Sequence, residues 1–458
     1  MISAEDETKI RFRGLNLHLM NNWLKSILIL SILACVLSFG TLGWLAVKTT
    51  NVADGSAARP LPAWETTLSA KKPGQINLEA SLDQATALAL RTVDELAARL
   101  RQLSATPGVK AGELVLTFKS EEALKAFRDQ AASLGFQVLH DDPRLLTSRV
   151  KYSDADAMAR ALRQNADDLD NIGLNYLAWV PGLPDTSQVD AANAGGAVPF
   201  GNSGLDAIGA TGDRKNWGTG TKVAVLDTGV TDHPSLQDSR VTHIDLVKDG
   251  LAPNGHGTAM ASLIAGDASQ DGGVAPASEI LDIRVADTRG ESNTALVAEG
   301  IMQAVDQGAK LINISLGTTG DSDVLRRAVE YALEKGVIVV AAAGNEQQTS
   351  LAYPAGYEGV ISVAAVDANG NQAYFSNSGE NLTLAAPGVG IVSAYSDSRI
   401  VVSSGTSQAT AITSGVISTL LGWGYPARGM TQTLTTGAQS TGAPKNQVGA
   451  GIVQLVRP

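Results

Sequence analysis

From residue 222 onward, short apolar segments alternate with segments of helical periodicity. The apolar segments are nearly continuous, which indicates strands that are buried on both faces. Such strands, separated by helices of about 10 to 15 residues, predict an α/β fold with a doubly wound, mostly parallel sheet. The expected strands are 222–226, 280–285, 311–315, 337–342 and 360–366, and the expected helices include 294–307 and 323–334. Ligands of such sheets bind at the carboxyl ends of the strands, so we expect the functional residues there.

A turn of small residues at 402–407 opens into an apolar, helix-patterned segment that reaches Leu421. Ser407 would then lie at a helix N-terminus, where unpaired backbone N–H groups favour developing negative charge. A hydroxyl in this position could act as a nucleophile. By itself, Gly-Thr-Ser before a helix more often marks an ordinary helix cap, so the catalytic interpretation depends on other motifs.

Two upstream motifs supply the groups that a serine nucleophile needs. Asp227 opens the tripeptide Asp-Thr-Gly directly after the first expected strand, and His256 lies in Asn-Gly-His-Gly-Thr at the start of an apolar helix. The order Asp, His, Ser is one of the chain orders in which a catalytic triad occurs. His256 would act as general base and then as general acid, and Asp227 would fix its tautomer. The other histidines, His18, His140, His233 and His243, lack this context and are interpreted as structural or solvated.

Together with the segment 339–346, these motifs resemble the signatures of the subtilisin-like serine proteases, the subtilase family. The resemblance extends over roughly 197–455. It implies that the side-chain amide of Asn345 and the backbone N–H of Ser407 form an oxyanion hole. It also implies that Ser315-Leu316-Gly317 and Ala342-Ala343-Gly344 line the pocket for P1, the substrate residue before the cleaved bond, with Ala352 near the pocket floor. None of these positions is charged, so we expect an apolar P1 preference.

The sequence departs from the family pattern in three places. Ala411 stands where a proline is usual and Gln408 where a methionine is usual, which puts catalytic efficiency in doubt but removes no catalytic group. The loop 266–273 is shorter than the loop that carries a strong calcium site in the family. Asp267 and Asp271 could still bind Ca²⁺, which prefers several oxygen ligands. Solvated loop acids are the preferred interpretation, and we assign no metal ligand.

The uncharged apolar segment 26–47 is long enough to cross a bilayer as a helix. A cleaved signal peptide is the alternative, but the segment is longer than a signal core and lacks a small-residue cleavage site. The basic residues Lys9, Arg11, Arg13 and Lys25 precede it. This asymmetry predicts a single-pass membrane protein with a cytoplasmic N-terminus (1–25), contact with the lipid bilayer through 26–47, and an extracytoplasmic catalytic domain.

Further parts are expected between the membrane helix and the peptidase domain (202–458). Residues 48–77 are interpreted as a linker, and 78–104 as an amphipathic helix that either dimerises as a coiled coil or packs on a neighbouring domain. Residues 110–181 show the order β-α-β-β-α-β of a ferredoxin-like split βαβ unit. In this place the unit resembles the family's propeptide, which assists folding and blocks the cleft; an unrelated spacer domain is the alternative. We expect self-cleavage in the linker 182–201, between Asp190 and Ala197.

Charge and competing motifs limit the functions to consider. With 35 Lys and Arg against 46 Asp and Glu, the net charge is −11, which argues against a nucleic-acid-binding surface. Cys35 is the sole cysteine, so no intramolecular disulfide can form. Asp-Thr-Gly also occurs in aspartic proteases, but these need two carboxylates and the chain has one copy. The remaining alternatives are a peptidase, with a polypeptide substrate and its own propeptide-like domain as partners, and an inactive membrane-anchored scaffold.

Overall fold

The computed structural model describes residues 92–180, 196–236, 240–267 and 272–457. The chain divides into two compact units, Met1–Ile76 and Asn77–Pro458, and every described residue belongs to the second. The predictions for 1–25, 26–47 and 48–77, and most of those for 182–201, therefore fall outside the described residues. Within the described residues, no helix is both long and apolar enough to cross a membrane.

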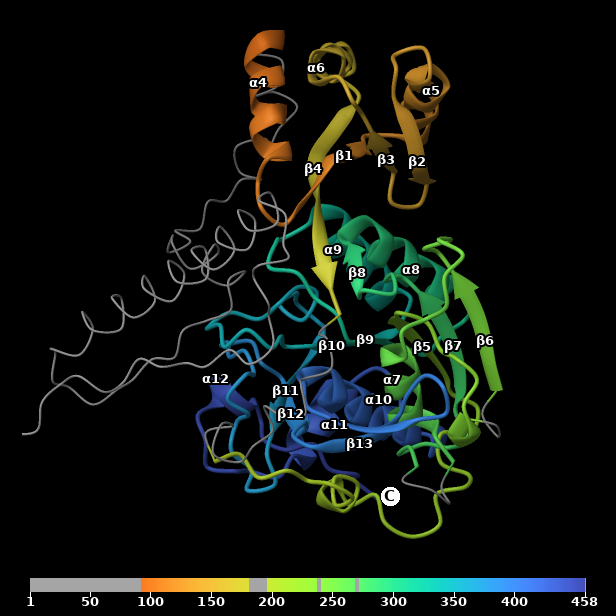
Figure 1. Cartoon of the computed structure of the whole chain (residues 1–458), viewed down its shortest axis with the longest axis vertical. Coiled ribbons are helices and arrows are strands. Elements are labelled where there is room, and N and C mark those ends of the chain that lie inside the picture. Colours follow the sequence, from red (N-terminus) through yellow and green to blue (C-terminus); the bar gives the residue numbers. More distant parts are fainter. Residues whose placement is uncertain (1–91, 181–195, 237–239, 268–271, 458) are drawn as a thin grey trace, which may run out of the picture. The chain divides into compact units, whose positions relative to one another are not determined.

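A parallel sheet of seven strands forms the core of the C-terminal part, in the order β12-β11-β10-β9-β5-β7-β6 (Figure 1). Every neighbouring pair runs parallel, as predicted. The order reverses beside β5, because β7 and β6 extend the sheet on one side and β9 to β12 on the other. Open α/β sheets bind ligands at such a reversal. The strands are β5 (Lys222–Asp227), β6 (Arg240–Asp245), β7 (Glu279–Arg284), β9 (Leu311–Ile314), β10 (Ile338–Ala342), β11 (Ile361–Val366) and β12 (Leu384–Pro387).

Helices cover both faces of this sheet (Figure 1). The helices α8 (Thr294–Asp306) and α9 (Asp323–Glu334) pack on one face, and α7 (His256–Ala265) and α10 (Thr406–Gly422) pack on the other. Helix α10 is buried along nearly its whole length. The hydroxyls of Thr410 and Thr413 are satisfied within the helix: they donate to the carbonyl four residues earlier, at 2.7 and 2.9 Å. Two shorter helices follow, α11 (Met430–Gly437) and α12 (Lys445–Val448).

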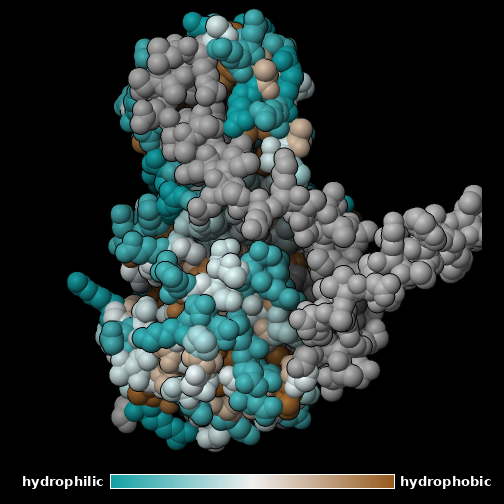
Figure 2. All heavy atoms as spheres, turned by 90° about the vertical axis from the view of Figure 1, so that its left-hand side faces the viewer, coloured by the Kyte–Doolittle hydropathy of each residue, from teal (hydrophilic) through white to brown (hydrophobic). Residues whose placement is uncertain are grey.

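The preceding part of the chain forms a smaller sheet with a core of its own. Its elements are α4 (Val93–Ser104), β1 (Val109–Phe118), α5 (Glu121–Ala131), β2 (Gln137–Asp142), β3 (Thr147–Lys151), α6 (Ala155–Gln164) and β4 (Leu169–Trp179). From β1 to β4 the elements follow the order β-α-β-β-α-β that the sequence predicts. The strands pair antiparallel in the order β2-β3-β1-β4. The visible surface of this split βαβ domain is largely hydrophilic (Figure 2).

Helix α4 belongs to the core of the split βαβ domain. Its Leu96, Leu100 and Leu103 are buried in the same cluster as residues of α6 and of the sheet. A capping box between Thr92 and Glu95 begins the helix. For the described part of 78–104, this arrangement favours packing on a neighbouring domain over a dimerising coiled coil.

Three short strands lie outside the parallel sheet, and one of them joins the two parts. Strand β8 (Glu291–Asn293) pairs antiparallel with β4 and extends the smaller sheet to five strands. Strands β13 (Ile391–Ala394) and β14 (Ile400–Ser403) form an antiparallel pair that leads into α10.

Candidate active site

The side chains of Asp227 and His256 are in direct contact. Asp227 is the last residue of β5 and His256 is the first of α7, and both are buried, with 0% and 4% of their surface exposed. The Nδ1 atom of His256 lies 2.8 Å from Oδ1 and 2.9 Å from Oδ2 of Asp227. A carboxylate only accepts hydrogen bonds, so Nδ1 carries the proton and Nε2 is left as the basic nitrogen.

Asn254 and Thr228 hold this pair in place. The Oδ1 atom of Asn254 accepts hydrogen bonds from the backbone N–H of His256 and from the hydroxyl of Thr228, both at 2.9 Å. Thr228 accepts in turn from the backbone N–H of Gly257 at 3.1 Å, and its own N–H donates to Asp227 at 2.7 Å. The two sequence motifs are therefore tied together by side chains that lie inside them. Sequence reasoning assigned no role to Asn254 or Thr228.

Two glycines allow the start of α7 to approach its neighbours. Gly255 precedes His256 with a φ of 97°, a conformation that residues with a Cβ rarely adopt. A Cβ on Gly257 would lie 2.5 Å from the backbone oxygen of Gly229. The glycines on both sides of His256 thus bring the helix against the loop that follows Asp227.

Ser407 is the second residue of α10, and 1% of its surface is exposed. Its hydroxyl donates to the backbone oxygen of Ser315 at 3.1 Å, and the hydroxyl of Ser315 donates to the backbone oxygen of Ser407 at 3.3 Å. Among the described residues, no hydrogen bond joins Ser407 to His256. Helix α7, which begins at His256, and helix α10, whose second residue is Ser407, pack against each other. In this state the hydroxyl is therefore turned toward β9 rather than toward the imidazole.

The side chain of Asn345 is fixed with its nitrogen free to donate. Its Oδ1 accepts from the backbone N–H and from the hydroxyl of Thr406, both at 2.9 Å. Within the described part of the chain, its Nδ2 makes no hydrogen bond. This nitrogen lies 3.3 Å from the position that a Cβ would take on Gly405, beside the turn that leads to Ser407. Thr406 is a second positioning residue to which sequence reasoning assigned no role.

The structure brings together the segments predicted to bind substrate. Ser315-Leu316-Gly317 follows β9, and Ala343-Gly344 follows Ala342 at the end of β10. The backbone N–H of Ala352 donates to the carbonyl of Ala343 at 2.9 Å. A Cβ on Gly317 would lie 2.9 Å from the Cβ of Ala352. These residues line up at the carboxyl ends of two neighbouring strands.

The end of β4 runs along one of these segments. Trp179 and Gly317 exchange backbone hydrogen bonds of 2.9 and 3.1 Å as an antiparallel pair. The next N–H, that of Val180, donates to the carbonyl of Gly290 at 2.8 Å. An extended segment of this chain therefore already occupies backbone groups of the predicted substrate-binding residues.

A buried polar cluster joins the split βαβ domain to the larger sheet's helices. Asn175 of β4 is fully buried, and its Nδ2 donates to Glu113 at 2.8 Å and to Asn293 at 3.0 Å. Its Oδ1 accepts from the backbone N–H of Ala295 at 3.1 Å, in the first turn of α8. A carbonyl at a helix N-terminus satisfies an otherwise unpaired N–H, so Asn175 acts as a cap supplied by another domain.

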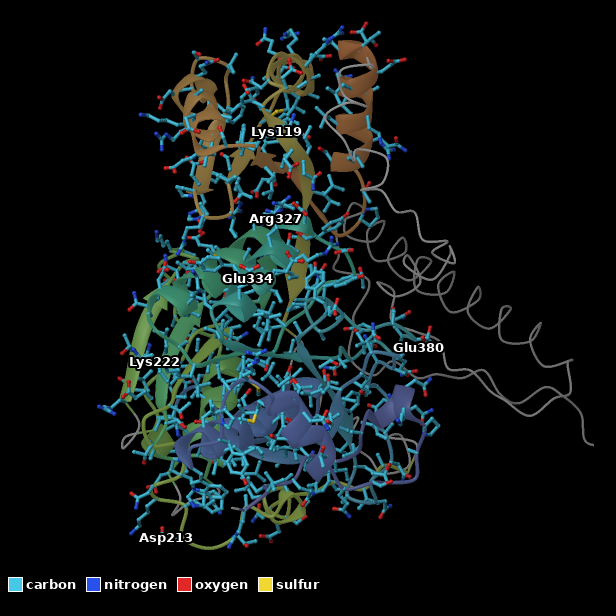
Figure 3. The ribbon with its side chains drawn as sticks, turned by 180° about the vertical axis from the view of Figure 1, so that it is seen from behind. Lys119, Asp213, Lys222, Arg327, Glu334 and Glu380 are labelled. Atoms are coloured by element: carbon cyan, nitrogen blue, oxygen red, sulfur yellow. The ribbon has the colours of Figure 1, made fainter. Side chains whose placement is uncertain are left out.

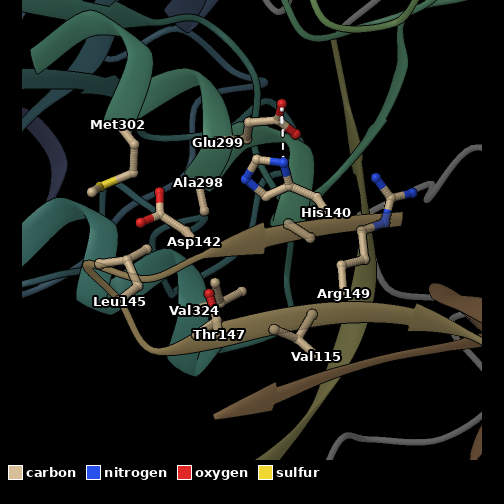
Figure 4. A pocket seen from close by; sticks show the side chains of 11 residues that line it. Val115, His140, Asp142, Leu145, Thr147, Arg149, Ala298, Glu299, Met302 and Val324 are labelled. Atoms are coloured by element: carbon tan, nitrogen blue, oxygen red, sulfur yellow. Dashed lines mark ion pairs between the residues drawn. The ribbon is translucent and has the colours of Figure 1, made fainter. Parts of the chain in front are cut away.

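Charged pairs surround this cluster. Arg144 lies 2.6 Å from Asp306 of α8, and Arg327 of α9 (Figure 3) donates to Asp170 of β4 at 2.8 Å. His140 of β2 lies 3.4 Å from Glu299 of α8 beside a small cavity (Figure 4). Exposed ion pairs of this kind contribute about 1 kcal/mol or less each.

The departures from the family pattern are accommodated in the core. Ala411 is fully buried in α10, and Gln408, which is 3% exposed, donates to the hydroxyl of Ser403 at 2.8 Å. Of the two candidate calcium ligands, Asp267 is described and Asp271 falls outside the described residues. Within the described residues, no group of three or more His, Cys, Asp or Glu side chains could hold a metal ion.

The fold and the site together define the class of the protein. Within the described residues, Asp227 bonds to an imidazole and not to a second carboxylate, which is not the arrangement of an aspartic protease. A buried carboxylate–imidazole pair at the reversal of a parallel sheet, with a serine and an amide donor at neighbouring element ends, is the arrangement of an α/β serine hydrolase. Residues 218–451, just over half of the chain, match the model of the Subtilase family. The chain belongs to this family, and these residues form a subtilisin-like serine endopeptidase domain.

Individual relatives agree with this assignment. The chain is 42% identical over 217 residues to thermitase of Thermoactinomyces vulgaris, covering 46% of this chain and 78% of thermitase. It is 41% identical over 222 residues to a thermostable alkaline protease of Halalkalibacterium halodurans, of which it covers 61%. Fervidolysin from Fervidobacterium pennivorans, a keratinolytic enzyme related to subtilisin, has a similar structure, with a TM-score of 0.63 at 26% identity; the similarity covers 76% of this chain and 60% of fervidolysin. The chain thus spans less than two thirds of two of these relatives.

Proposed function

We propose that the chain hydrolyses peptide bonds through an acyl-enzyme, with Ser407 as nucleophile, His256 as general base and Asp227 as the group that orients the imidazole. The buried contact between His256 Nδ1 and Asp227 carries this proposal, because it leaves Nε2 as a base on a helix that packs against α10, whose second residue is Ser407. The Ser407 hydroxyl, which donates to Ser315 in this state, would have to turn away from it to donate to His256. Catalytic hydrogen bonds in ligand-free sites are often formed only when substrate binds.

The expected P1 preference depends on the side chains of the predicted substrate-binding residues. Leu316, Ala343 and Ala352 are buried and apolar, and a pocket without charge binds an apolar side chain at the lowest desolvation cost. Digestion of an unbiased peptide library with the active protein should give cleavage chiefly after apolar residues, as mass spectrometry of the products would show. A preference for lysine or arginine at P1 would contradict this assignment.

The split βαβ domain acts as a propeptide in this proposal, and the chain is made as a zymogen that cleaves itself between Asp190 and Ala197. Two observations support this role: the paired backbone hydrogen bonds of Trp179 with Gly317 of the predicted substrate-binding segment, and the cap that Asn175 supplies to α8. The similarity to fervidolysin covers 76% of this chain, which is more than residues 202–458 contain. The proposed cleavage region lies mostly outside the described residues.

The segment 26–47 serves as the membrane anchor, with the peptidase domain on the extracytoplasmic side. Its length, its lack of charge and the basic residues before it support this role. In cells that express the full chain, the unprocessed form should stay in the membrane pellet after alkaline carbonate extraction. A matched chain without 26–47 should be released, and release of both forms alike would contradict the anchor.

The competing function is an inactive scaffold that retains the fold. No residue of the proposed catalytic set is replaced, which favours the peptidase. Absence of all hydrolysis by a folded, fully processed protein would favour the scaffold.

A further inference from the structure

A second carboxylate–imidazole pair lies beside the pair formed by Asp227 and His256. The Nδ1 atom of His243 on β6 lies 2.9 Å from Oδ2 of Asp282 on β7. Asp282 is 3% exposed, and its other oxygen, Oδ1, has no hydrogen-bond partner within the described residues. The side chain of His243, in contrast, is 53% exposed. A buried carboxylate is thus joined to an imidazole that exchanges protons with solvent.

The strand register places this pair on the same face of the sheet as Asp227. Asp282 pairs with Val225 of β5 on one side and with His243 of β6 on the other. Side chains at paired positions share a face, and so do residues two apart in one strand. Asp227 therefore shares the face of Asp282, one strand away and diagonal to it. With the spacing of neighbouring strands and the rise per residue of a β-sheet, such a diagonal spans about 8 Å between Cα atoms.

A hydrogen bond also connects Asp282 to the loop that follows Asp227. Its Oδ2 accepts from the backbone N–H of Val230 at 3.0 Å. Val230 follows Gly229, whose backbone oxygen lies against Gly257 of α7. The carboxylate of Asp282 thus fixes the loop on which the start of the His256 helix rests.

The charges of the pair depend on each other. Burial raises the pKa of the Asp282 carboxyl, and the nearby charge of Asp227 adds to this effect. The hydrogen bond to Asp282 raises the pKa of His243, so His243 is protonated at low pH and loses its charge as pH rises through that raised value. When His243 is protonated, the pair is neutral; when His243 is neutral, an ionised Asp282 is uncompensated.

Arg284 is not the counter-ion of Asp282, although it lies two residues away on β7. It bonds instead to Asp245 at 3.3 Å and to Asp249 at 2.9 Å. The ionisable groups near the pair are Asp227 of β5, Asp245 of β6, Arg284 of β7, His256 of α7 and, from loops, Asp232, Asp249 and Tyr395. On the other face of the sheet, Glu299 and Asp306 of α8 lie next to His140 and Arg144.

We propose that His243 and Asp282 are positioning residues of the peptidase site, which hold the loop after Asp227 and adjust through their charge how readily His256 takes up a proton. The negative charge of Asp282 favours the imidazolium of His256, and the positive charge of His243 disfavours it. Asp227 lies between Asp282 and the imidazole of His256, so a charge on Asp282 acts over roughly 10 Å, and one charge at that range shifts such a protonation equilibrium by about half a pH unit. This inference rests on the proposed peptidase function.

The test compares single and double replacements in the full chain after it has reached full activity. Asp282→Asn keeps an oxygen that can accept from Val230, and should move the acid limb of kcat/KM for a small chromogenic peptide to lower pH by about half a unit. His243→Gln should move the limb to higher pH, because it removes the opposite charge. The double variant should lie near the wild type. A purely structural role would change activity or stability without opposite shifts, so limbs that do not move, or that move together, would overturn the inference.

The control is Glu279→Gln on β7. Glu279 forms an ion pair of 2.6 Å with Arg240 between the same two strands, at their other end. This variant should leave the acid limb in place. Titration of His256 by NMR, with labelled histidine, distinguishes a failure of this inference from a failure of the proposed peptidase function. Opposite shifts of this titration in a protein without hydrolytic activity would support the role of His243 and Asp282 and reject the peptidase function. An active protein whose His256 titration does not shift in either variant would support the peptidase function and reject the role of His243 and Asp282.

Discussion

A Ser407→Ala chain should remain full length, whereas the wild type yields a shorter C-terminal fragment that begins between Asp190 and Ala197. The change removes the proposed nucleophile and leaves the Asp227–His256 contact intact, so the fold and the propeptide-like contacts are retained. Turnover of peptide substrates should fall by about 10⁶-fold, a magnitude taken from a subtilisin and not from this chain. Gel migration and N-terminal sequencing of the fragment provide the measurement.

A neighbouring serine offers a matched control for this change. Ser404 lies in the same turn and accepts from the backbone N–H of Gly390 at 2.9 Å. Ser404→Ala makes the same chemical change without touching the proposed nucleophile, and this chain should be cleaved as the wild type is. Equal cleavage of the Ser407→Ala chain would reject self-processing and point to another protease.

Asn345→Ala should lower kcat by about 10² to 10³-fold with little change in KM, again a magnitude that comes from a subtilisin. The reason is geometric: Thr406 holds the Oδ1 of Asn345, so that Nδ2 can donate to the oxyanion that forms only during the reaction. A donor that acts only in the transition state affects kcat and leaves ground-state binding nearly unchanged. Steady-state kinetics on a peptide with an apolar P1 residue would measure both constants.

The exposed amide of Gln347 in the same turn provides the control for Asn345. Gln347→Ala removes a side-chain amide that makes no hydrogen bond among the described residues, and kcat should stay near that of the wild type. A raised KM at unchanged kcat in Asn345→Ala would show instead that Asn345 binds the substrate.

The sheet could be predicted from the sequence where strands are buried on both faces. The strands β5, β9, β10 and β11 are almost wholly apolar, and their sequence patterns are unambiguous. The edge strand β6 is different: its residues are mostly exposed and polar, so nothing in its pattern distinguishes it from a loop. Its pairing with β7 is what makes it a strand, and that contact is not local in the sequence.

Some residues of the candidate site could likewise be identified from the sequence, and others could not. Asp227, His256 and Asn345 lie in motifs whose local sequence sets the turn or helix start, so they could be identified. Other contacts join segments that are far apart in the chain, and the spacing of residues in the sequence does not predict them. These are the contacts of Asn254 with Thr228, of Thr406 with Asn345 and of Ser407 with Ser315. His243 is interpreted from the sequence as structural or solvated because it lacks the Gly-Thr context of His256, and its contact with Asp282 joins two strands that are not adjacent in the sequence.

Labelling with a serine-directed fluorophosphonate, followed by mass spectrometry of the peptides, tests the central claim most directly. If Asp227 and His256 activate Ser407, the processed protein should carry one adduct, on Ser407. A folded His256→Ala protein, cut between Asp190 and Ala197 by an added protease, should label slower by several orders of magnitude. A folded wild-type protein without an adduct, or one that labels no faster than the His256→Ala protein, would contradict the account.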